Sequence, residues 1–160
     1  MNNFYKQMLN IKETLKLAGA KLGKNIFIGH EVFFELENAP LIMIEDNVVI
    51  SAFCKFILHD SSLNNTLGSP IKYAPIRLKR NCYIGLDSII MPGSIIGENT
   101  IVGAGSLVKG TLKSNSVYIG RPVKYYCSIQ ELNNKWKRDK NAYYIETPKW
   151  HKRDENEEKK

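Results

Sequence analysis

The stretch that decides the fold is residues 78–108, LKRNCYIGLDSIIMPGSIIGENTIVGAGSLV. Every sixth residue in it is aliphatic: Leu78, Ile84, Ile90, Ile96, Val102 and Val108. Two earlier segments keep the same period, namely Leu22, Ile28 and Phe34, and then Ile44, Ile50 and Phe56. A period of six is neither the 3.6 of a helix nor the 2 of an alternating strand. It predicts short strands that each bury one residue within a stacked repeat.

A second pattern runs in phase with the aliphatic residues. Three positions after an aliphatic residue stands a type that tolerates a left-handed backbone: Asn25, Asn47, Asn81, Asp87, Gly93, Asn99 and Gly105. Each hexad is therefore interpreted as a short strand followed by a tight turn. Three hexads would close one triangular coil, which predicts an all-β solenoid, a parallel β-helix of four to five coils over residues 21–124.

The repeat breaks twice, and breaks in a solenoid mark loops. Ten residues separate Phe34 from Ile44, so we expect a bulge around residues 37–40. Twenty-two residues separate Phe56 from Leu78, so we expect a loop excursion over residues 59–77. Loops on a rigid scaffold are where binding and catalytic residues concentrate.

Both ends of the chain have apolar residues at helical spacing. Phe4, Met8, Ile11, Leu15 and Ala18 predict an amphipathic helix in an N-terminal cap, residues 1–20. A C-terminal helical cap over residues 125–150 is predicted by Tyr125, Ile129, Leu132 and Trp136. Caps are expected because an uncovered terminal coil exposes its core. The charged segment 151–160 is predicted to be disordered.

Composition narrows the partners and the compartment. The chain has 23 basic and 16 acidic residues, a net charge of +7, but the basic residues are scattered. We therefore expect an anionic cofactor rather than nucleic acid. No apolar run is long enough for integral membrane association, and the N-terminus lacks a secretory apolar core, so a cytoplasmic location is expected. Three cysteines without CxxC spacing argue against a disulfide framework or a thiolate zinc site.

Three segments resemble one family, the hexapeptide acetyltransferases that include galactoside, maltose and polysaccharide O-acetyltransferases. They are the run from Tyr83 to Ser106, the ending NSVYIGRPVK at residues 115–124, and LHDSS at residues 58–62. The resemblance covers about residues 18–125. It implies a left-handed β-helix, a homotrimer with active sites shared between subunits, and acetyl-CoA as acyl donor without a metal. The implied reaction is O-acetylation of a sugar hydroxyl, on a cell-surface polysaccharide or its sugar or sugar-nucleotide precursor.

His59 stands where the loop excursion begins, and the resemblance implies that it is the general base. A neutral imidazole can take the proton of an acceptor hydroxyl as the oxygen attacks the thioester carbon. For Asp60 two interpretations remain: it holds the imidazole tautomer or contacts the acceptor, or it closes a turn through its own side chain.

The resemblance places the donor along the outside of the last coils. The matching positions are Leu86, Ala104, Lys109, Gly110 and Lys124, with Arg121 as a further partner for CoA phosphate. The Leu86 N–H is the candidate donor to the oxyanion. The family pattern Thr-Lys-Asp is replaced here by Lys109-Gly110-Thr111, so for Lys109 a cofactor contact and a solvated surface position are both open.

Four alternatives are kept. Within the acyltransferases these are N-acetylation of an amino-sugar nucleotide and, less favoured because a longer insertion is absent, the xenobiotic group that acetylates antibiotics. The β-helix also occurs in zinc carbonic anhydrases, but His30, His59 and His151 include no near-spaced pair. The fourth alternative is a trimeric scaffold without catalysis, which would not bind acetyl-CoA.

Overall fold

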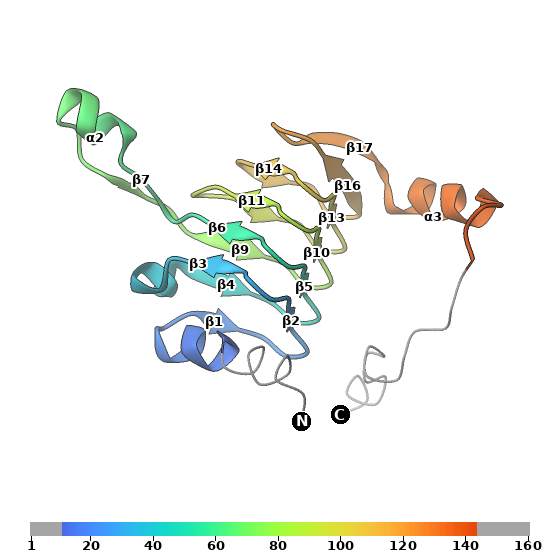
Figure 1. Ribbon diagram of the computed structural model, residues 1–160, viewed down its shortest axis with the longest axis horizontal. Helices are drawn as coiled ribbons and strands as arrows, with labels where there is room; N and C mark the ends of the chain where they lie inside the picture. The colour runs from blue at the N-terminus through green and yellow to red at the C-terminus, as the bar shows by residue number, and fades with distance from the viewer. Residues whose placement is uncertain (1–10, 144–160) are drawn as a thin grey trace.

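The computed structural model describes residues 11–143 as a stack of triangular coils, with an arm on one side and a helix beside the last coils (Figure 1). Each complete coil contributes one strand to each of three sheets. Sheet A contains β1 (Lys21–Leu22), β4 (Ile42–Ile44), β9 (Ile76–Leu78), β12 (Ile95–Ile96) and β15 (Thr111–Leu112). Sheet B contains β2 (Phe27–Ile28), β5 (Val49–Ile50), β10 (Tyr83–Ile84), β13 (Ile101–Val102), β16 (Ser116–Ile119) and β17 (Lys124–Ser128). Sheet C contains β3 (Phe33–Phe34), β6 (Lys55–Phe56), β11 (Ile89–Ile90) and β14 (Leu107–Val108).

The strand register follows the repeat. Ile84 pairs with Val102 and Ile90 with Val108, so one regular coil is three hexads long. The strands of the coils pair in parallel, and β17 joins sheet B antiparallel to β16. The strands form four complete coils and begin a fifth, which confirms the predicted parallel β-helix.

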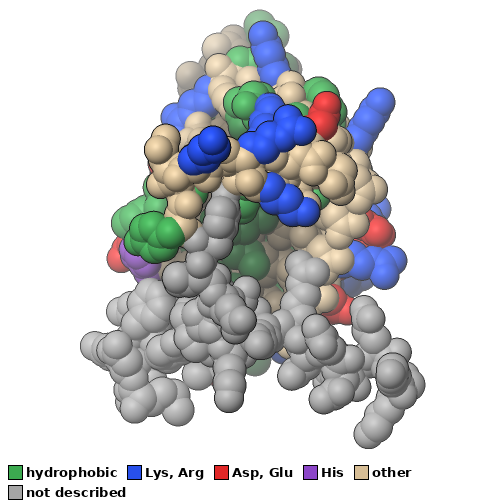
Figure 2. Space-filling model, turned by 90° about the vertical axis from the view of Figure 1, so that its right-hand side faces the viewer, with side chains coloured by type: hydrophobic (Ala, Val, Ile, Leu, Met, Phe, Trp, Pro, Cys, Tyr) green, Lys and Arg blue, Asp and Glu red, His purple; other side chains and the backbone are tan. Residues whose placement is uncertain are grey.

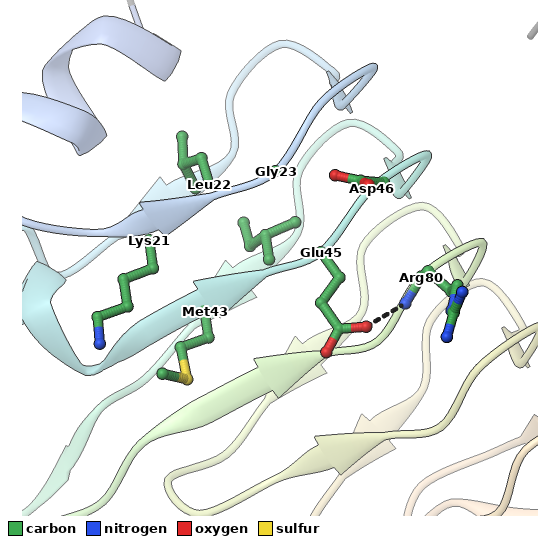
Figure 3. Close-up of a pocket in the computed structure, with 8 residues that line it drawn as sticks. Lys21, Leu22, Gly23, Met43, Glu45, Asp46 and Arg80 are labelled. Atoms are coloured by element: carbon green, nitrogen blue, oxygen red, sulfur yellow. Dashed lines mark hydrogen bonds between the residues drawn. The ribbon is translucent and has the colours of Figure 1, made fainter. Parts of the chain in front are cut away.

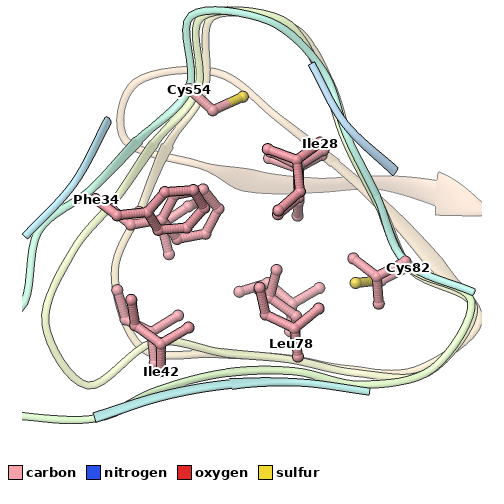
Figure 4. Packing of buried hydrophobic residues seen from close by; sticks show 14 of the residues in the cluster. Ile28, Phe34, Ile42, Cys54, Leu78 and Cys82 are labelled. Atoms are coloured by element: carbon pink, nitrogen blue, oxygen red, sulfur yellow. The ribbon is translucent and has the colours of Figure 1, made fainter. Parts of the chain in front are cut away.

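The aliphatic residues of the repeat form the core. Ile84, Ile90, Ile96, Val102 and Val108 are fully buried. Figure 4 shows buried side chains of the core, among them Ile28 and Leu78, stacked in columns inside the coils. The Phe34 and Phe56 rings stack with their centroids 4.7 Å apart. Because each layer is covered only by its neighbours, burial of apolar area across successive coils is what holds the solenoid together.

The predicted turn residues have the expected backbone. Positive φ is found at Asn25, Asn47, Asn81, Asp87, Gly93, Asn99 and Gly105. Along one corner the amides also bond to one another: Asn81 Nδ2 donates to Asn99 Oδ1 (3.0 Å), and Asn99 Nδ2 donates to Asn115 Oδ1 (2.9 Å). Two further positive-φ residues, Glu31 and Phe53, do not belong to the types that favour this conformation.

Both breaks in the repeat are loops. The first contains a 3₁₀ helix, η1 (Leu36–Leu41), whose backbone leaves the triangular outline. The second is an arm made of β7 (His59–Asp60), α2 (Ser62–Leu67) and β8 (Lys72–Tyr73). β7 and β8 pair in antiparallel fashion, with His59 opposite Tyr73, and Figure 1 shows the arm projecting from the coils. The sequence predicted the excursion but not its hairpin.

Helices lie at both ends of the coils. Residues 11–17 are helical and Leu15 is fully buried; the predicted N-terminal residues 3–10 of this helix lie outside the described residues, as does the predicted tail 151–160. At the other end α3 (Ile129–Arg138) begins at a capping box between Ser128 and Glu131. Tyr125, which was predicted to belong to the helix, lies instead in β17 because this segment pairs with β16. Within residues 11–143 no helix is long and apolar enough to cross a membrane.

Candidate active site

His59 lies at the corner between sheets C and A, where the arm leaves the coil. The preceding residue, Leu58, is fully buried and anchors the chain, so the imidazole is held at the base of the arm. Its Nδ1 atom lies 2.7 Å from Oε2 of Glu35. The histidine side chain is 37% exposed, whereas the glutamate is 6% exposed. The Tyr73 ring from β8 lies beside the imidazole, with a centroid distance of 5.7 Å.

Glu35 is a candidate site residue that the sequence analysis did not identify. It follows β3 and is 24 positions before His59, in the first break of the repeat, where the hexad pattern assigns no role. The available signal was the register: Phe34 pairs with Phe56, so the residues that follow them lie on adjacent coils. Asn38 Nδ2 also donates to Glu35 Oε2 (3.3 Å), which helps to hold the carboxylate in place.

This pair sets the chemistry of the imidazole. The hydrogen bond that Nδ1 donates to Glu35, together with the negative charge of that carboxylate, raises the pKa of His59. A carboxylate on Nδ1 favours the tautomer in which Nδ1 carries the proton and donates it to Glu35. The Nε2 lone pair is then available to accept a proton from a bound hydroxyl or amine.

Asp60 has a different set of contacts. Its Oδ1 accepts hydrogen bonds from the Ser62 backbone N–H (3.0 Å) and the Ser62 hydroxyl (2.7 Å). These bonds lower the pKa of Asp60. This is the local turn that the sequence left open, and the carboxylate on the imidazole is that of Glu35. A catalytic role for Asp60 stays a prediction.

Two predicted donor residues stack at another corner, between sheets B and C. Leu86 and Ala104 are exposed there on successive coils, and the Gly105 N–H donates to the Leu86 carbonyl (2.7 Å). Arg121 belongs to the same corner: its Nη2 atom donates to the Asp87 carbonyl (3.2 Å) and lies 3.3 Å from Asp87 Oδ2. Lys55 also pairs with Asp87 (3.2 Å). Arg121 thus ties the turn between β16 and β17 to this corner.

The other donor positions lie elsewhere. Lys109 and Gly110 follow β14, at the corner between sheets C and A, and the Lys109 charge contributes to the lowered pKa of Asp60. Lys124 is exposed on β17. Apart from Lys124, the predicted residues fall into two groups within one chain. His59, Asp60, Lys109 and Gly110 lie at the C–A corner, and Leu86, Ala104 and Arg121 lie at the B–C corner.

Basic side chains gather near the last coils. Figure 2 shows lysine and arginine side chains gathered on the upper part of the face, at the level of the last coils and α3. The exposed basic residues of β17 and α3 include Lys124, Lys135, Lys137 and Arg138.

A cavity of about 460 Å³ lies on sheet A beside Lys21, Met43, Glu45 and Arg80 (Figure 3), away from both groups of predicted residues. Among residues 11–143 no cluster of His, Cys, Asp and Glu could hold a metal ion.

Comparison with known proteins agrees with the repeat. The family described as bacterial transferase hexapeptide (six repeats) matches residues 75–110. The chain is 31% identical over 132 residues to the galactoside O-acetyltransferase of Escherichia coli (strain K12), which covers 76% of this chain and 60% of that protein. The chain thus spans about 60% of the length of this curated relative.

Solved structures share the fold. One is a hexapeptide-repeat acetyltransferase from Vibrio cholerae O1 biovar eltor, complexed with acetyl coenzyme A; its TM-score is 0.59 at 24% identity, over 69% of this chain and 60% of that chain. Another is a mutant of AntD, an N-acyltransferase from Bacillus cereus, in complex with dTDP and coenzyme A; its TM-score is 0.50 at 25% identity, over 86% of this chain and 98% of that chain. These neighbours confirm the left-handed β-helix. Residues 75–110 thus match the hexapeptide-repeat family of bacterial transferases, and the chain is similar to a galactoside O-acetyltransferase in sequence and to a hexapeptide-repeat acetyltransferase in fold.

Proposed function

We propose that the protein is an acetyl-CoA-dependent O-acetyltransferase that acts on a sugar hydroxyl, on a cell-surface polysaccharide or its precursor. The observation that carries this proposal is the 2.7 Å contact between His59 Nδ1 and the buried Glu35 carboxylate. This contact allows the His59 imidazole, which lies where the arm leaves the coil, to act as a general base. The relative named galactoside O-acetyltransferase and the neighbour complexed with acetyl coenzyme A support the donor and the acceptor class.

The reaction follows from these groups. His59 Nε2 takes the proton of the acceptor hydroxyl while the oxygen attacks the thioester carbon. The oxygen of the former carbonyl becomes negative and accepts a hydrogen bond from the Leu86 N–H. When the C–S bond breaks, the electron pair leaves on sulfur, and the imidazolium returns the proton to the CoA thiolate. Glu35 stabilises the imidazolium between these two steps because its carboxylate accepts the hydrogen bond from Nδ1.

A homotrimer is part of the proposal. Since His59 and Leu86 lie at different corners of the triangle, a site that uses both needs the corner of a second subunit. The outward residues of sheets B and C are largely apolar, as expected of faces that meet other subunits: Val49, Tyr83 and Ile101 on sheet B, and Phe33, Ile89 and Leu107 on sheet C. We place the reaction in the cytoplasm, where acetyl-CoA is available.

N-acetylation of an amino-sugar nucleotide is the second candidate. It is favoured by the AntD complex, since the chain covers 98% of that N-acyltransferase, which was solved with dTDP and coenzyme A. The same base serves both reactions, because an amine must also lose a proton after it attacks the thioester. The two candidate functions therefore differ only in the acceptor group, a hydroxyl or an amine.

The test is incubation of the purified chain with acetyl-CoA and a panel of free sugars, sugar nucleotides and amino-sugar nucleotides, followed by mass spectrometry. A mass increase of one acetyl group on a hydroxyl-only acceptor supports O-acetylation, and an increase confined to amino sugars supports the second candidate. A thermal shift with acetyl-CoA is measured in parallel. If acetyl-CoA neither shifts the melting temperature nor acetylates any acceptor, the protein is a scaffold and the proposal is wrong.

A further inference from the structure

Phe53 breaks a rule that most other turns of the solenoid obey. Left-handed backbone suits Asn, Asp and Gly, and such residues occupy the equivalent positions on the two coils above, Asp87 and Gly105. Phe53 adopts φ = 62°, a conformation in which a bulky side chain is strained. A strained residue at a turn points to a role other than holding the turn.

The Phe53 ring contributes little to the core. It is 43% exposed on the outside of the corner, whereas its neighbour Cys54 is fully buried. The Phe53 ring contacts the His30 imidazole of the coil below, with a centroid distance of 4.9 Å and an interplanar angle of 81°. Such edge-to-face contact fixes the orientation of a ring while leaving a face open.

The position of this ring relates it to the donor corner. The B–C corner is continuous through backbone hydrogen bonds: Phe53 N–H to the His30 carbonyl (3.1 Å), and Asp87 N–H to the Ala52 carbonyl (3.1 Å). Leu86, the predicted oxyanion donor, is therefore one coil above Phe53. Neighbouring strands are about 4.8 Å apart, which is within the width of one sugar ring.

We propose that Phe53, oriented by His30, is an aromatic platform that holds the acceptor sugar by one face of its pyranose ring. This inference rests on the proposed function and specifies its acceptor site. The axial C–H groups of a pyranose form an apolar face that packs on an aromatic ring, while its hydroxyl groups point sideways. A sugar lying on Phe53 presents a hydroxyl toward the thioester one coil above.

Three variants test the platform. Phe53→Asn supplies a residue suited to the left-handed turn and removes the ring, while Phe53→Tyr keeps the ring. Glu31→Asn is the matched control, because Glu31 has the same strained backbone (φ = 54°) at the same corner, one coil below, without an aromatic group. Both Asn variants should melt about 2–4 °C higher than wild type, because each relieves left-handed strain.

Sugar binding is measured without turnover, by saturation-transfer NMR with methyl β-D-galactopyranoside and methyl α-D-glucopyranoside. Irradiation of aromatic protons should transfer to the ring C–H protons of at least one probe in wild type, Phe53→Tyr and Glu31→Asn, and not in Phe53→Asn. With the best acceptor from the panel, Phe53→Asn should raise the acceptor KM about tenfold and leave the acetyl-CoA KM unchanged.

Several results would overturn the platform: no saturation transfer in wild type, transfer that survives in Phe53→Asn, or a lower melting temperature of Phe53→Asn. Dissociation of the oligomer by Phe53→Asn in sedimentation would also do so, because it would make the ring a subunit contact. Acetyl transfer with an unchanged acceptor KM in Phe53→Asn rejects the platform alone. Saturation transfer without any acetyl transfer in wild type rejects the proposed function alone.

Discussion

At the scale of single residues, the contact between His59 and Glu35 determines which group can move a proton. The glutamate is buried and the histidine is partly exposed, so the carboxylate faces the protein and the imidazole is open to solvent. Asp60 is adjacent in sequence but is bonded to Ser62. Two predictions belong to this scale.

Replacement of His59 by Ala removes the proposed general base. We expect kcat to fall by about 10²–10⁴, the usual contribution of such a base, while the dissociation constant for acetyl-CoA stays within twofold of wild type. Turnover is measured with the best acceptor and donor binding by calorimetry. Asp60→Asn is measured alongside to test the catalytic role predicted for Asp60. Turnover of His59→Ala equal to wild type would refute the mechanism.

Replacement of Glu35 by Gln tests the second member of the pair through its pH profile. Glu35 raises the pKa of His59, and the base works only when neutral, so wild-type activity falls as pH drops through that raised value. Glu35→Gln lowers the pKa of His59, so this acidic limb should move to lower pH. The plateau rate should also fall about 10- to 100-fold, because the imidazole is less well oriented. A limb that moves to higher pH, or does not move, contradicts the assignment.

At the scale of elements, the stability of the coils depends on the inward residue of each two-residue strand. In β12, Ile96 is fully buried and Ile95 faces outward on sheet A. The paired positions thus provide a test within one strand, with the same residue type on its two sides.

Ile96→Ala should lower the free energy of unfolding by about 2–5 kcal/mol, because it removes buried methyl groups and leaves a cavity between neighbouring coils. Ile95→Ala, the matched control, should cost about 1 kcal/mol or less, since surface substitutions are usually mild. Urea unfolding followed by circular dichroism measures both. Equal losses in the two variants would mean that the coil interior does not dominate stability.

At the scale of the whole molecule, the separation of His59 and Leu86 on two corners makes the proposed trimer testable. We expect three chains per particle in light scattering, with each site built from His59 of one chain and the Leu86–Ala104 corner of another. His59→Ala lacks the base, and Ala104→Trp blocks the donor corner with a large side chain at an exposed position. Each variant alone should be inactive.

When these two variants are refolded together as mixed trimers, sites that combine an intact base with an intact corner should form. Random mixing predicts about a quarter of wild-type activity. Wild type refolded in the same way is the control. If each site lay within one chain, every site would carry a defect and the mixture would be inactive, which would refute the shared site.

Much of the fold could be predicted from the sequence. The period of six, the turn residues such as Asn81 and Asn99, and the two breaks depend on local backbone preference and on one inward residue per strand. These rules repeat along the chain, so six hexads in a fixed register leave few alternatives. His59 could also be found, because it stands where the repeat stops.

Only the tertiary structure decided which groups meet. Glu35 reaches His59 across 24 residues because two coils stack at the first break, and no local rule specifies what stands opposite a loop. The same stacking puts Leu86 and Ala104 at a different corner from His59, and brings the strained Phe53 within one coil of Leu86. The repeat determines the scaffold because each hexad needs only its own turn residue and one inward aliphatic residue. The site depends on side chains that meet across neighbouring coils, and their distance along the sequence does not predict that contact.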